Sequence, residues 1–109
     1  MITFDQFKQL MAFETEGTYC IEIAFSIKDC EKFSSCWMGK TPEEKSKADT
    51  YWFGLTEDGN NAYEYRTFED FASAKVFEGR SLVEIWYKVT ISEINGCDPE
   101  EQILHYIGK

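Results

Sequence analysis

Four cysteines and a single histidine are the side chains of this sequence best suited to metal binding or nucleophilic catalysis. Structural zinc sites usually hold their ligands in short, paired spacings. Five residues separate Cys30 from Cys36, and seven separate Cys97 from His105, so neither pair has that spacing. A catalytic cysteine needs an oriented base beside it, and we expect His105 in the last turn of a helix, where histidines usually contact carbonyl groups. We therefore predict that the thiols, Cys20 included, are unpaired and hold no metal.

The run Met-Gly-Lys-Thr at positions 38–41 has the ending of a phosphate-binding loop. The full pattern needs a second glycine at position 34, because the backbone must wrap around phosphate there. Ser34 occupies that position, and no apolar strand precedes it. We expect these residues to form a loop that leads into a helix starting at Thr41 and Pro42.

Neighbouring acidic residues fall where helices are expected to begin, at 43–44, 69–70 and 100–101. Negative charge in a first helical turn is stabilising, so these pairs need no catalytic explanation. The sequence also lacks the alternating oxygen ligands of a calcium loop. We predict no enzymatic activity and no cofactor.

Aromatic residues make up 17% of the chain, more than one face of a small core readily hides. Tyr51, Trp52 and Phe53 place bulky rings on both faces of an expected strand. Tyrosine and tryptophan are favoured at protein interfaces. If helices cover only one sheet face, the other displays rings beside carboxylates; the alternative is that both faces are covered. The predicted partner-binding residues are Trp52, Glu57, Asp58, Tyr63, Tyr65, Glu69 and Asp70.

The helices that must position these residues are marked by their capping residues. Thr3 with Gln6, and Ser81 with Glu84, have the spacing of capping boxes, in which each side chain satisfies a backbone donor of the other residue. Apolar residues then recur at helical spacing. Helices are expected after Thr3, Thr41, Thr67, Ser81 and Asp98, and the stripe Leu82, Ile85 and Trp86 is expected in the core.

The strands are marked by alternation and by one turn. Residues 19–27 alternate between apolar and polar or small side chains, which predicts a half-buried strand. Residues 51–57 and 60–66 flank Asp58-Gly59, a strong signal for a two-residue hairpin turn. In that register Gly54 lies opposite Tyr63 and Trp52 opposite Tyr65. With a further strand at 89–94, we predict one α+β domain over residues 1–109, a small, mainly antiparallel sheet of three to four strands with helices packed on one face.

Twenty acidic residues against eleven basic ones give the chain a net charge of −9. A nucleic-acid binder needs a basic face to neutralise phosphates, and an anionic membrane also attracts basic segments. We therefore predict neither direct nucleic-acid binding nor membrane binding. The chain starts without a secretory signal pattern, so we expect a cytoplasmic protein with reduced thiols.

These observations favour a small, acidic, non-enzymatic binding protein of bacterial or phage type. The expected function is that of an immunity or inhibitor protein that neutralises a basic partner, such as a toxin or an enzyme acting on nucleic acid. One alternative is a phage-type anti-defence protein that uses the same physics on a host effector. Another is a small ligand-binding domain or enzyme with a pocket between sheet and helices.

Overall fold

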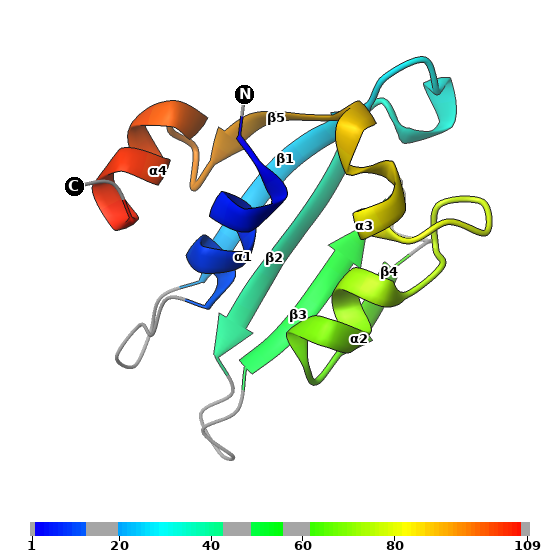
Figure 1. The fold of residues 1–109 in the computed structure, drawn as a ribbon, viewed down its shortest axis with the longest axis horizontal. Helices are drawn as coiled ribbons and strands as arrows, with labels where there is room; N and C mark the ends of the chain where they lie inside the picture. Colours follow the sequence, from blue (N-terminus) through cyan, green and yellow to red (C-terminus); the bar gives the residue numbers. More distant parts are fainter. Residues whose placement is uncertain (1, 13–19, 43–48, 56–61, 108–109) are drawn as a thin grey trace.

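In the part of the chain that the structure describes, five strands form one antiparallel sheet, and the helices lie together on one side of it (Figure 1). The computed structural model describes residues 2–12, 20–42, 49–55 and 62–107. The strands stand side by side in the order β4-β3-β2-β1-β5. This arrangement confirms the α+β class and corrects the predicted strand number from three or four to five. The strands are β1 (Ile21–Ile27), β2 (Cys36–Pro42), β3 (Asp49–Gly54), β4 (Ala62–Tyr65) and β5 (Val89–Ile94).

Helices begin after Thr3, Thr67, Ser81 and Asp98, as their capping residues predict, whereas Thr41 lies in a strand. Thr3 and Gln6 form a complete capping box, and so do Ser81 and Glu84. The side chain of Thr67 accepts a hydrogen bond from the backbone N–H of Asp70 at the start of the helix Phe68–Ser73. No helix in the described part of the chain is long and apolar enough to cross a membrane. The α-helices are α1 (Phe4–Met11), α2 (Phe68–Ser73), α3 (Leu82–Ile85) and α4 (Pro99–Tyr106), with 3-10 turns η1 (Glu31–Phe33) and η2 (Trp86–Lys88).

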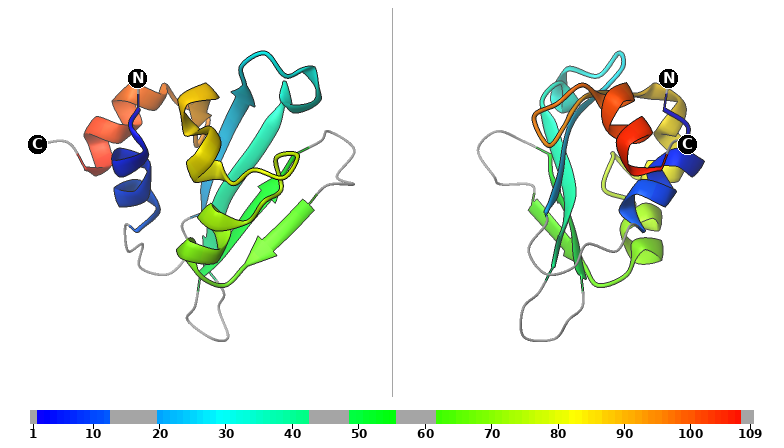
Figure 2. Two further views of the ribbon diagram at one scale, coloured as in Figure 1. Left: turned by 45° about the vertical axis from the view of Figure 1, so that its right-hand side comes forward. Right: turned by 90° about the vertical axis from the view of Figure 1, so that its left-hand side faces the viewer.

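The helices form a layer on one side of the sheet, as the right-hand view of Figure 2 shows, and the buried apolar side chains form one core cluster that both layers supply. The apolar residues of β1 are buried on this covered face, and Met38 and Phe53 continue the face onto β2 and β3. The rings of Phe53 and Phe71 stack with their centroids 4.2 Å apart. The predicted core stripe is confirmed, since Leu82, Ile85 and Trp86 are all buried.

The central strand β2 is the largest correction to the sequence-based expectations. The run at positions 38–41, expected to be a loop that leads into a helix at Thr41 and Pro42, is instead part of β2, which pairs with β1 on one side and β3 on the other. Thr41 and Pro42 extend this strand; residues 43–48 lie outside the described part. Sheet pairing overrides the local Thr-Pro-Glu-Glu signal because both edges of β2 find partners.

Lys40 explains why the apolar pattern of β2 is hard to see. Its side chain lies on the covered face and is only 2% exposed. The ammonium group donates a hydrogen bond of 2.8 Å to the carbonyl oxygen of Met11, at the end of α1. A cation is favourable at this negative end of a helix. Lys40 therefore ties the central strand to the first helix.

The β3–β4 hairpin exists, but its predicted register is wrong by one residue. Gly54 lies opposite Ala62, and Phe53 lies opposite Tyr63. The Asp58-Gly59 turn itself falls outside the described residues. A shift of one residue in one strand moves each cross-strand partner to the opposite face of the sheet. The tyrosines of β4 therefore lie on the covered side, beside Phe53 and Tyr51.

Candidate functional site

The sheet face opposite the helices carries no other element of the described chain (Figure 2). Cross-strand pairing aligns its residues in two rows that run across the sheet. One row holds Glu93, Ala24, Trp37, Gly54 and Ala62, and the other holds Glu22, Gly39, Trp52 and Glu64. We call these nine residues the tryptophan face.

Trp52 is held flat against the sheet because its cross-strand neighbour is a glycine. A Cβ atom at Gly39 would lie 2.7 Å from Cζ2 of Trp52 and would also collide with the backbone oxygen of Ile21. The indole nitrogen of Trp52 donates a hydrogen bond of 3.1 Å to the hydroxyl of Thr41. The ring is therefore preorganised over Gly39, with part of its surface exposed to solvent.

Trp37 lies opposite the other glycine of this face. Gly54 is its partner on β3, and a Cβ there would lie 4.0 Å from the Cβ of Trp37. The Trp37 side chain is 42% exposed, whereas the core aromatic residues are almost fully buried. Small residues, Ala24 and Gly54, flank it in its row. The face thus presents two indole rings, each of which lies opposite a glycine on a neighbouring strand.

Carboxylates border the two rings. Glu64 lies directly opposite Trp52 on the neighbouring strand. Side chains in directly opposite positions of an antiparallel pair are close enough to contact each other. Glu22 and Glu93 lie on the β1 and β5 side, and all three are exposed. No lysine or arginine occurs among the described strand residues that point to this face. The face therefore combines aromatic surface that a partner could bury with charged side chains that are all negative.

The structure does not bring the predicted partner-binding residues onto one surface. Trp52 lies on the tryptophan face, whereas Tyr63 and Tyr65 point to the covered side of β4. Tyr65 packs against Phe53 and Phe71, and burial, with a smaller effect of the neighbouring Tyr63, raises its pKa.

The acidic members of that predicted set are also separate from Trp52. Glu69 and Asp70 are exposed in the first turn of α2, on the helix side of the sheet. Glu57 and Asp58 lie outside the described residues.

Sequence reasoning missed Trp37, Glu22, Glu64 and Glu93. The alternation of residues 19–27 already places Glu22 and Ala24 on the polar face of β1. Trp37 could not be placed because β2 was not recognised as a strand. Glu64 and Trp52 share a face only in the observed register of the hairpin.

The remaining chemistry-bearing groups do not form a second centre in the described part of the chain. All four cysteines are free, and no group of three or more His, Cys, Asp or Glu residues there could hold a metal ion. Cys36 is buried and its thiol donates to the Leu55 carbonyl. Burial is the main reason that its pKa rises from 9.0 to about 11, so this thiol is a poor nucleophile at neutral pH.

No protein-family model, curated protein or solved structure matches this chain.

Proposed function

We propose that this chain is a small acidic binding protein of the immunity or inhibitor type, which neutralises a basic toxin or enzyme that acts on nucleic acid. The tryptophan face is the observation that carries the proposal. It offers two preorganised indole rings within a border of carboxylates, on a side of the sheet that no described element covers. The protein acts by occupying its partner, without turnover of a substrate.

The two kinds of side chain on this face have separate roles. Trp37 and Trp52 supply the apolar area that becomes buried, and tryptophan is among the residues that most often dominate binding energy. Glu22, Glu64 and Glu93 attract a basic surface and orient it during encounter, together with the net charge of −9. A groove that binds phosphates is such a surface, so carboxylates placed in it compete with nucleic acid.

The cation–π interaction links these roles at close range. An arginine or lysine that approaches Trp37 or Trp52 meets the negative face of an indole ring, with carboxylates nearby. The proposal places the protein in the cytoplasm, where its four free thiols would stay reduced.

Affinity capture from the native cell, followed by an inhibition assay, tests this proposal. We expect the wild-type chain to capture a basic protein and to inhibit its cleavage or processing of nucleic acid. Trp37→Ala should lose both effects. Tyr87→Ala is the matched control, because Tyr87 is a 64% exposed aromatic residue in η2, outside the sheet.

Two results would contradict the proposal. One is capture and inhibition that Trp37→Ala leaves unchanged while Tyr87→Ala abolishes them. The other is a purified chain that converts a small molecule by itself.

A further inference from the structure

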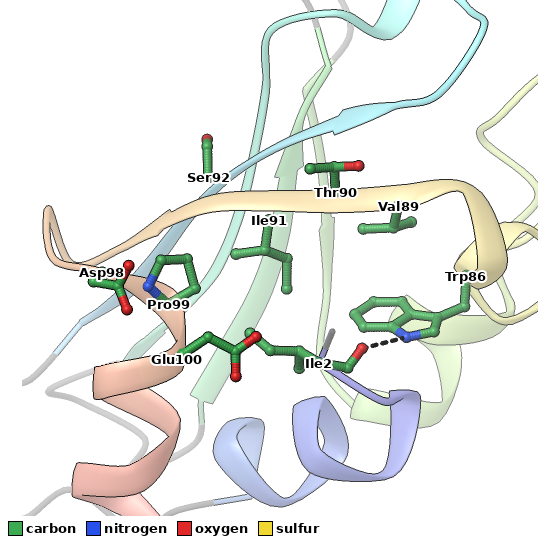
Figure 3. Close-up of a pocket in the computed structure, with 9 residues that line it drawn as sticks. All are labelled: Ile2, Trp86, Val89, Thr90, Ile91, Ser92, Asp98, Pro99 and Glu100. Atoms are coloured by element: carbon green, nitrogen blue, oxygen red, sulfur yellow. Dashed lines mark hydrogen bonds between the residues drawn. The ribbon is translucent and has the colours of Figure 1, made fainter.

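A hollow of about 470 Å³ lies along β5, at the edge of the sheet farthest from β4 (Figure 3). Val89 and Ile91 point into it from β5, toward Ile2 and Trp86, whereas Thr90 and Ser92 point away. The indole nitrogen of Trp86 donates a hydrogen bond of 3.1 Å to the Ile2 carbonyl. This bond joins two of the residues that line the hollow. At one end lie the acidic side chains of Asp98, the N-cap of α4, and of Glu100, in the first turn of that helix.

The outer edge of β5 offers backbone groups beside this hollow. Lys88 accepts a hydrogen bond of 2.8 Å from Lys28 across the β1–β5 pair. Residues that bond to the neighbouring strand alternate with residues that do not in an antiparallel pair. Counted from Lys88, the next residue whose backbone faces β1 is Thr90. The N–H and C=O of Ile91 therefore point away from β1. At the two ends of β5, the N–H groups of Val89 and Ile94 already bond within their own turns.

We infer that this edge binds an extended, basic peptide segment as an added sixth strand. The segment would bond to the backbone of Ile91 and place one apolar side chain in the hollow. A lysine or arginine of the segment would lie near Asp98 and Glu100. Strand addition of this kind takes its affinity from main-chain bonds and its specificity from side-chain pockets.

Charge favours a basic peptide over a second copy of this chain at the same edge. Two copies would each bring a net charge of −9, and each would add the acidic first turn of α4 to one interface. Like charges in a desolvated contact are destabilising. A basic segment reverses the sign of that interaction.

Titration of labelled protein with a defined peptide tests the inference. The probe is a capped peptide of about six to eight residues, the length of an ordinary strand, in which a valine and a lysine stand two residues apart, so that both side chains point to the face that meets the hollow. The chain has three tryptophans, and their indole N–H signals report separately on the hollow (Trp86) and on the tryptophan face (Trp37 and Trp52). We expect shifts at Trp86 and Ile2, and slowed hydrogen exchange at the Ile91 amide.

Two changes should weaken binding without altering the sheet. Methylation of the peptide nitrogens that face β5 removes main-chain bonds and should weaken binding about tenfold. The variant Asp98→Asn with Glu100→Gln should also weaken it several-fold, and asparagine preserves the helix cap. A peptide with glutamate in place of lysine is the matched control and should bind more weakly still.

Three results would overturn the inference. Shifts confined to Trp37 and Trp52 would place the peptide on the tryptophan face. Equal affinity for the methylated peptide would exclude strand addition. A concentration-dependent dimer that protects Ile91 without peptide would identify a second copy as the occupant.

Discussion

The two faces of the sheet use aromatic residues in opposite ways. On the covered face, Phe53 stacks on Phe71 and the rings pack against one another until little surface is exposed. On the tryptophan face, Trp52 and Trp37 lie opposite glycines and keep part of their surface in solvent. Trp52 and Phe53 are neighbours in β3, so one strand supplies both faces. Rings that hold the fold together can thus be told from rings available to a partner by what lies across from them.

Phe71→Ala should produce the largest loss of stability. Phe71 is fully buried and contacts aromatic rings from α1, β3, β4 and α2. Removing a buried phenylalanine ring typically costs about 3–5 kcal/mol, because the cavity closes only in part. Denaturant unfolding of the purified variant measures this loss. An unchanged midpoint would show that the covered face is not the core.

Gly39→Ala should destabilise the protein by about 1–3 kcal/mol, the usual range for overpacking. The new methyl group collides with the Ile21 carbonyl and the ring of Trp52. The same unfolding assay applies, with Gly54→Ala as the matched control. A methyl group at Gly54 meets ordinary contact distances, so the control should change stability much less. Equal losses in the two variants would argue against the close packing of Trp52 on Gly39.

Alkaline pH should weaken the covered face through Cys36. Burial raises the pKa of this thiol from 9.0 to about 11. An unfolded thiol with the lower pKa releases its proton first, so stability present below pH 9 falls as the pH rises toward 11. Unfolding measured across this range should show the loss, and Cys36→Ala should show a smaller one. Identical pH profiles for the two proteins would contradict this assignment.

Trp37→Ala should have the smallest effect on stability, within about 1 kcal/mol. Its side chain is 42% exposed, and changes at exposed sites seldom exceed this size. Thermal unfolding checks the value against Phe71→Ala. A loss near that of Phe71→Ala would mean that Trp37 serves the fold and would remove the contrast between the faces.

Local signals in the sequence predicted more of the helices than of the sheet. Thr3, Thr67, Ser81 and Asp98 mark helix starts because a cap depends only on residues three positions away. β2 was missed because Lys40, a charged residue, occupies a buried position. Its partner, the Met11 carbonyl, lies far away in sequence.

The binding surface was harder to predict because a face depends on register. The Asp58-Gly59 signal predicted the hairpin correctly but placed Gly54 opposite Tyr63 instead of Ala62. That single shift assigned Tyr63 and Tyr65 to the surface of Trp52, whereas Glu64 takes that place. Only the paired strands reveal that Trp37 and Trp52 belong together.

Association and dissociation rates with the captured partner, measured at two salt concentrations, test the central claim most directly. We expect Glu64→Lys to slow association and to reduce its dependence on salt, because exposed charges act on encounter. Trp37→Ala should mainly speed dissociation, and Tyr87→Ala should change neither rate. Association that is independent of salt, together with a Trp37→Ala variant that dissociates like the wild type, would contradict the assignment of the tryptophan face.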